Sequence, residues 1–147
     1  MRKQKLGLWI FITYCALMLW LLFGREPYGN GTTYWQHVAG NMNLLPFETI
    51  IRFVGFLAGD FSVELKRHAI INLVGNVIMF VPLGFFLPML WGKFRLLWRC
   101  LLQGALIIVC VELIQLFTLV GSCDFDDLLL NVIGIAMGYG LYRLTTK

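Results

Sequence analysis

The residues best suited to chemistry form a short acidic run late in the chain. Asp124, Asp126 and Asp127 lie within four positions, and Asn131 follows one helical turn after Asp127. Carboxylates this close repel one another, which favours a cation or a basic partner beside them. An Asp at a helix start also caps free backbone N–H groups, and Asp124 is in position to do so. Capping accounts for one or two of the three carboxylates, so the rest are candidates for ligand binding.

Two further polar pairs have the spacing of a single helical face. Glu112 and Gln115 are three residues apart, and Asn72 and Asn76 are four apart. Both pairs lie in apolar segments, where a carboxylate must be protonated, paired or open to water. For Asn72 and Asn76, hydrogen bonds between helices and ligand binding are equally good explanations. For Glu112 we favour a functional role, as a proton-transfer group or a cation ligand, because a Gln would serve a structural role at lower cost.

These polar residues belong to a chain that is too apolar for a soluble protein. Of its 147 residues, 59% are hydrophobic and 14% are charged, whereas soluble domains have about 45–50% and about 25%. A soluble domain of this size cannot bury so much apolar surface, and twelve Phe with few charges exclude disorder. The sequence therefore predicts an integral membrane protein. Its net charge of +4 then reflects membrane topology, and no nucleic-acid partner is expected.

Four segments are long and apolar enough to cross a bilayer, at about 6–23, 69–91, 100–120 and 126–143. The first follows a basic start but lacks the small residues of a cleavage site, so we expect an uncleaved span. The last is uncharged over only fifteen positions, which cover about 22 Å. Its start must therefore include Asp126 and Asp127, or lie in thinned bilayer or against protein.

The segment 45–58 is apolar but contains Pro46, Glu48 and Arg52, which is typical of an interfacial or re-entrant helix. The predicted fold is an all-α integral membrane protein, a four-transmembrane-helix bundle with this additional helix. One domain over 1–147 accounts for the chain. The Gly-, Asn- and Thr-rich segment 24–43 is predicted to be a loop.

Charge distribution predicts the orientation of this bundle. With four spans and a cytoplasmic N-terminus, the cytoplasmic side receives eight of the twelve basic residues and no carboxylate, namely Arg2, Lys3, Lys5, Lys93, Arg95, Arg99, Arg143 and Lys147. A fifth span at 45–58 would move three of these outside, against the positive-inside rule. We therefore expect a multi-pass membrane protein with both termini in the cytoplasm. The polar residues then converge on the outer side as a water-accessible pocket, bordered by Arg25 and the turn at 43–47.

The sequence contains none of the common cofactor or catalytic motifs. The four Cys lack metal-type spacing, and no Ser-His-Asp set, H-E-x-x-H or Walker loop is present. His37 and His68 lie apart. No cofactor is predicted, with a divalent cation at the Asp run as the alternative. If the protein is an enzyme, the catalytic candidates are Glu112, Asp126 and Asp127.

Several motifs, in order, resemble the VanZ-like family of small bacterial membrane proteins. They are Leu22-Phe23-Gly24-Arg25, Asn43-Leu44-x-Pro46-Phe47, Asn72-x-x-Gly75-Asn76-x-x-x-Phe80-x-Pro82-Leu83-Gly84, Glu112-x-x-Gln115 and Asp124-x-Asp126-Asp127-x-x-x-Asn131-x-x-Gly134-x-x-x-Gly138. Many family members carry an arginine shortly before the acidic motif, but 118–122 has none here. In this chain Arg25 or Arg52 would have to supply that charge. The resemblance implies a cell-envelope role linked to low-level resistance to the glycopeptide teicoplanin.

Three functions are consistent with these observations. The first is binding of a lipid, a lipid-linked precursor or a lipoglycopeptide, with membrane lipids as the other partners. The second is a metal-assisted membrane enzyme acting on such a substrate, with Glu112 as the acid or base. The third, ranked well below, is a proton or ion transporter subunit that requires oligomerisation. The predicted ligand-binding residues are Arg25, Asn72, Asn76, Glu112, Gln115, Asp124, Asp126, Asp127 and Asn131.

Overall fold

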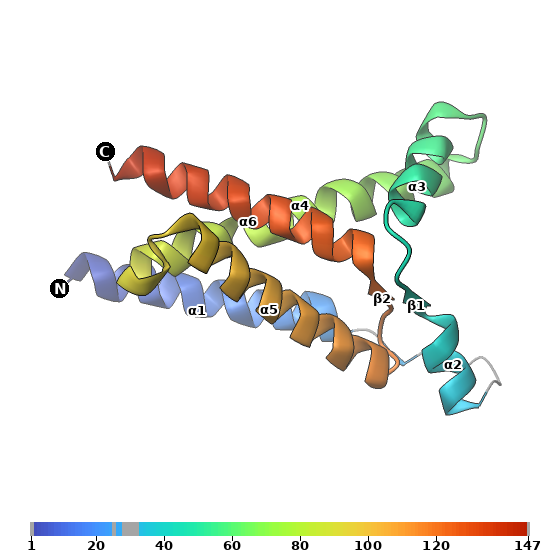
Figure 1. Cartoon of the computed structure of the whole chain (residues 1–147), viewed down its shortest axis with the longest axis horizontal. Helices are drawn as coiled ribbons and strands as arrows, with labels where there is room; N and C mark the ends of the chain where they lie inside the picture. The colour runs from blue at the N-terminus through green and yellow to red at the C-terminus, as the bar shows by residue number, and fades with distance from the viewer. Residues whose placement is uncertain (1, 25, 28–32, 147) are drawn as a thin grey trace.

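The computed structural model of the protein describes residues 2–24, 26–27 and 33–146. Within them the chain is almost entirely helical (Figure 1). The elements, in chain order, are α1 (Arg2–Phe23), α2 (Tyr34–Gly40), β1 (Met42–Asn43), α3 (Glu48–Ala58), α4 (Val63–Leu90), η1 (Gly92–Phe94), α5 (Leu97–Phe117), β2 (Cys123–Asp124) and α6 (Phe125–Thr145).

Four of these helices have the length and hydropathy of membrane spans: α1 over Lys5–Phe23, α4, α5 and α6. They run roughly side by side, and the two chain ends lie together at one end of the bundle (Figure 1). We call this the terminal end. The opposite end, where α6 begins at Phe125 and where α2 and α3 lie, we call the acidic end. The predicted all-α membrane bundle is confirmed.

The helix boundaries differ from the predicted spans mainly in α4, which begins at Val63 rather than at residue 69. Ser62 is its N-cap and accepts a hydrogen bond from the Leu65 N–H at 3.3 Å, while Glu64 lies in the first turn. With 28 residues, α4 is about 42 Å long, which exceeds a hydrocarbon core of about 30 Å. Its first turns therefore extend beyond the bundle, where α3 packs against them.

The two short helices at the acidic end lie on either side of β1. The predicted additional helix is present as α3, whose 11 residues cover about 17 Å and are too few to span a bilayer. The prediction of a loop over 24–43 was wrong for 34–40, which form α2. Its local signal is a capping arrangement at the first turn, where the Gln36 side chain accepts a hydrogen bond from the Thr33 N–H at 3.1 Å.

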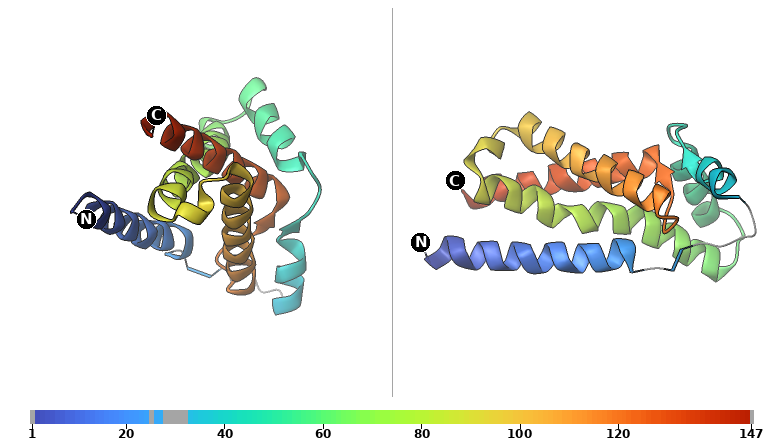
Figure 2. Two further views of the ribbon diagram at one scale, coloured as in Figure 1. Left: turned by 60° about the vertical axis from the view of Figure 1, so that its left-hand side comes forward. Right: turned by 90° about the horizontal axis from the view of Figure 1, so that it is seen from below.

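The most extensive packing between helices joins α4 and α6, which lie side by side in the bundle (Figure 2). A Cβ atom added at Gly134 would overlap the Val77 carbonyl oxygen, and one at Gly138 would overlap the Val81 carbonyl oxygen. The predicted close approach of helices at Gly134-x-x-x-Gly138 is thus present, with α4 as the partner. This contact fixes the start of α6 beside the polar face of α4.

Replacing Gly138 by Ala should destabilise the bundle, because the new methyl group overlaps α4 backbone that cannot move away. We expect a loss of about 1–3 kcal/mol in the free energy of unfolding, measured by reversible unfolding in detergent. The matched control is Gly140→Ala, two residues further along α6, where a Cβ meets nothing within 4 Å. Equal stability of the two variants would contradict the proposed role of this contact.

Candidate functional site

A pair of two-residue strands organises the acidic end. β1 and β2 pair in parallel, with Met42 opposite Cys123 and Asn43 opposite Asp124. The Cys123 N–H also donates to the Asn41 carbonyl at 2.9 Å. The pairing brings the residues before α3 to the start of α6, although about 80 positions separate them in the chain.

Asp124 joins this strand pair to α3 and α6. Its Oδ1 accepts a hydrogen bond from the Asp126 N–H at 2.8 Å, so it is the N-cap of α6, as predicted. Its Oδ2 accepts from the Thr49 hydroxyl at 2.6 Å and from Asn43 Nδ2 at 3.3 Å. The Arg52 guanidinium donates to the same Thr49 oxygen at 3.2 Å. The Arg52 guanidinium is therefore connected to Asp124 through the Thr49 hydroxyl. Residues 118–122, just before the acidic motif, contain no arginine.

Thr49 is a central residue that the sequence analysis missed. Its side chain is only 3% exposed and connects Asp124, Asn43 and Arg52. Thr49 and Phe53 are four residues apart and are both buried, so they lie on the same inward face of α3. This spacing was the signal in the sequence that could have identified Thr49. The sequence alone did not reveal it because the partners of this face come from α6 and β1.

Asp126 anchors α3 to α6. It is completely buried, and its two oxygens accept the Phe47 N–H at 2.6 Å and the Ile50 N–H at 3.0 Å. These are free donors at the start of α3, whose own N-cap residue, Phe47, has a left-handed φ of 67° and no capping side chain. A carboxylate from α6 therefore caps the N-terminus of α3. Both oxygens of Asp126 are used in this way.

Asp127 and Asn76 connect the two most closely packed helices. Asn76 Nδ2 on α4 donates to Asp127 Oδ1 on α6 at 2.5 Å. The structure thus brings these two predicted site residues into direct contact. Only one of the two Asp127 oxygens is used in this bond.

Three buried acceptor oxygens near this contact have no hydrogen-bond partner among the described residues. They are Asn72 Oδ1 on α4, Glu112 Oε1 on α5 and Asn131 Oδ1 on α6. Glu112 is 7% exposed and lies close enough to interact electrostatically with Asp127 and Asp124. A buried acceptor left unpaired costs about 1–3 kcal/mol, and such groups are few in native proteins. Three helices therefore each contribute a hydrogen-bond acceptor to the interior at the acidic end.

The other oxygen of Glu112 faces Cys123. The Cys123 Sγ lies 3.8 Å from Glu112 Oε2 and donates to it. Burial and the neighbouring Glu112 raise the pKa of the Cys123 thiol, so the neutral thiol is the form that occupies this contact. The thiol is a weak donor and satisfies Glu112 only in part.

One predicted site residue, Gln115, forms its hydrogen bond away from this group. Gln115 Nε2 donates to the Leu22 carbonyl at 2.9 Å, so this side chain ties α5 to the end of α1. Arg25 lies outside the described residues. In the described part of the chain, no three His, Cys, Asp or Glu side chains form a metal-type cluster.

The four apolar helices and the acceptor-lined interior define a multi-pass α-helical membrane protein with a polar site at one end. The chain belongs to the VanZ/LLP1 family, whose profile matches residues 11–146. It is similar to Protein VanZ of Enterococcus faecium, with 25% identity over 134 residues that cover 91% of this chain and 71% of that protein. No solved structure matches the chain. The family resemblance predicted from the ordered motifs is confirmed.

Replacing Asp126 by Asn should loosen α3 without disturbing the spans. The amide keeps one acceptor but turns its NH₂ toward a backbone donor, at a cost of about 1.5–3 kcal/mol for a lost charged hydrogen bond. We expect hydrogen exchange over 48–58 to become roughly 10-fold faster or more, measured by mass spectrometry. The control is Asp60→Asn at an exposed position just after α3. Unchanged protection of α3 in the Asp126 variant would show that another contact holds this helix.

Proposed function

We propose that this VanZ-family membrane protein binds a lipid-linked or lipid-like ligand, such as a lipoglycopeptide of the teicoplanin type, at its acidic end. The observation that carries the proposal is that three buried side-chain oxygens on three helices have no hydrogen-bond partner among the residues that the structure describes, namely those of Asn72, Glu112 and Asn131. Amide oxygens only accept hydrogen bonds, and so does an ionised carboxylate, so these three oxygens cannot satisfy one another when Glu112 is ionised. They call for a ligand that brings N–H or O–H donors or a positive charge, as amino and hydroxyl groups of an envelope headgroup do.

The surroundings of this site suit an amphiphile. Beside it, α3 and the turn before it expose large apolar side chains, including Ile51 at 69%, Leu45 at 66% and Leu44 at 60% exposure. α3 is held to α6 through Asp126, so this apolar face is fixed next to the polar interior. A ligand with a polar headgroup and an apolar chain would place one part on each surface.

The orientation in the proposal follows from charge. Lys93, Arg95, Arg99 and Arg143 belong to η1, the start of α5 and the end of α6, at the terminal end, whereas every Asp and Glu lies toward the acidic end. The positive-inside rule then places both termini in the cytoplasm of a bacterial plasma membrane. The acidic end faces the outside, where envelope precursors and glycopeptides are met.

The central test is untargeted mass spectrometry of small molecules retained by the purified protein. The variants are Glu112→Gln and Asp127→Asn, which change charge with little change in shape. Loss of a charged hydrogen bond should reduce the retained ligand about 10-fold or more, while the variants remain in the membrane. Asp60→Asn is the charge-matched control. Equal retention by the wild type and both site variants, or no lipid-like ligand at all, would overturn the proposal.

The same variants should affect resistance in cells. Expression of the wild type in a teicoplanin-susceptible strain should raise the minimum inhibitory concentration, and Glu112→Gln or Asp127→Asn should abolish the increase at equal protein level. Asp60→Asn should retain it. Resistance that remains in both site variants would show that the resistance does not depend on this site.

A fusion experiment tests the orientation separately. Green fluorescent protein at the C-terminus should fluoresce and alkaline phosphatase at the same position should be inactive, because both report a cytoplasmic terminus. A phosphatase-positive, non-fluorescent result would require the opposite orientation. The ligand test above does not depend on this outcome, since it is done on purified protein.

One observation favours catalysis as a second candidate. Glu112 has a buried oxygen without a partner among the described residues, beside another carboxylate, Asp127. Such an arrangement is typical of groups that move protons. Turnover of a lipid-linked substrate that is lost with a chelator and lost in Glu112→Gln would support a metal-assisted enzyme over a binding protein.

A further inference from the structure

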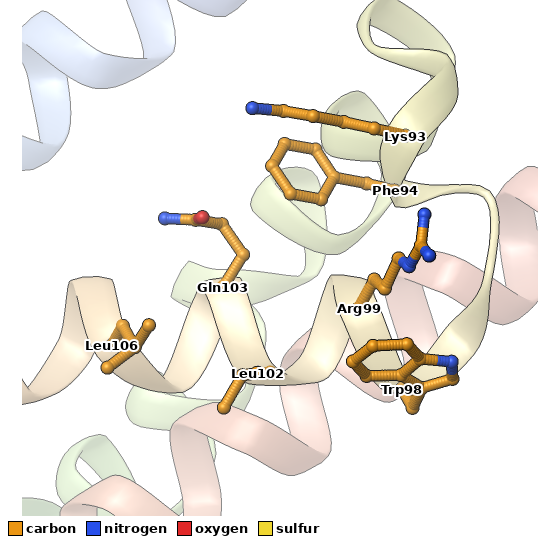
Figure 3. A pocket seen from close by; sticks show the side chains of 7 residues that line it. All are labelled: Lys93, Phe94, Trp98, Arg99, Leu102, Gln103 and Leu106. Carbon is orange, nitrogen blue, oxygen red and sulfur yellow. The ribbon is translucent and has the colours of Figure 1, made fainter.

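A second site candidate lies at the terminal end, far from the acidic cluster. A hollow of about 250 Å³ opens between η1 and the first turns of α5. Its lining residues are Lys93, Phe94, Trp98, Arg99, Leu102, Gln103 and Leu106 (Figure 3). They combine two cations, two aromatic rings and two leucines, a mixture that differs completely from the acceptor-rich interior at the other end.

The two cations are held at the rim by aromatic rings. Lys93 Nζ lies 4.8 Å from the centroid of the Phe94 ring, and the Arg99 guanidinium carbon lies 5.1 Å from the Trp98 ring. Each such contact is worth about 0.5–1 kcal/mol at an exposed position. Figure 3 shows Lys93 and Phe94 on one side of the hollow and Gln103 and Arg99 on the side of α5. In this view the Lys93 amine and the Arg99 guanidinium lie on opposite sides of the Phe94 ring, and both residues line the hollow.

No acidic side chain is available to neutralise these cations. All eight Asp and Glu residues belong to the acidic end or to the segments that lead into it. Arg95 and Arg143, which also belong to the terminal end, are basic as well. This part of the surface therefore attracts anions, and near a membrane the abundant anions are lipid phosphates.

The rest of the lining suits a lipid rather than a small soluble anion. Leu102 and Leu106 are each 54% exposed and lie one turn apart, leading from the hollow along the outer face of α5. Trp98, at the start of the same span, is typical of the headgroup level of a bilayer. The Gln103 amide adds a donor that is not hydrogen-bonded to any described part of the chain and can reach a phosphodiester or glycerol oxygen.

We propose that this hollow binds the phosphate headgroup of an anionic phospholipid from the leaflet at the terminal end. Lys93 and Arg99 contact the phosphate, Gln103 donates to the headgroup, and the Leu102–Leu106 face receives an acyl chain. The site is separate from the ligand site at the acidic end. This proposal does not depend on which side of the membrane the terminal end faces, because it concerns only the leaflet at that end.

The test is native mass spectrometry of the purified full chain, titrated with phosphatidylglycerol and with phosphatidylcholine of the same acyl composition. The double variant Lys93→Gln/Arg99→Gln should weaken phosphatidylglycerol binding about 30-fold. Each basic residue near an anionic lipid strengthens binding about 5-fold, and the two factors multiply. The control Arg95→Gln/Arg143→Gln removes the same charge from the same end but leaves the lining intact. It should change binding by less than about threefold.

A second variant separates the hollow from general electrostatics. Gln103→Trp keeps every charge and fills the space, so it should also displace phosphatidylglycerol, with folding checked by thermal unfolding. Equal loss in the Arg95/Arg143 control, or full binding in Gln103→Trp, would overturn the proposal. Competition by excess inorganic phosphate that removes all bound phosphatidylglycerol would assign the site to a free anion instead of a lipid.

Discussion

The Asp126 carboxylate and the two backbone N–H groups it accepts hold the acidic end together. α3 is too short to span a membrane and begins with donors that its own residues leave free, so it needs an acceptor from elsewhere in the chain. A fully buried carboxylate on α6 supplies that acceptor. The same constraint explains why the cluster has three carboxylates, since Asp124 caps α6, Asp126 caps α3 and Asp127 receives Asn76.

The Asp126 contact depends in turn on the close packing of α4 and α6. Gly134 and Gly138 let the two helices approach until backbone meets backbone, which places the start of α6 beside Asn76. From that position the parallel pair β1–β2 brings the residues before α3 within reach. Hydrogen bonds in a membrane protein interior must be completed inside the protein. The buried oxygens of Asn72, Glu112 and Asn131 are the exception, because they have no hydrogen-bond partner within the described part of the chain.

The two ends of the bundle present opposite chemistry. The acidic end gathers carboxylates and amide oxygens in its interior, while the terminal end exposes cations and aromatic rings at its surface. We propose donor-bearing envelope ligands for the first and lipid phosphate for the second. The apolar helices between them separate these two regions of opposite charge by the length of the bundle.

The sequence by itself determined the four spans, the extra short helix and the family, because hydropathy and helical spacing act over neighbouring residues. It also placed Asp124 as a cap, which depends only on the next turn of helix. It did not reveal Thr49, α2, the use of Asp126 by α3 or the hydrogen bond from Gln115 to the Leu22 carbonyl. These features depend on which distant helix faces which side chain. Only the tertiary structure decides that, since the partners of a buried polar group come from segments far away in the chain.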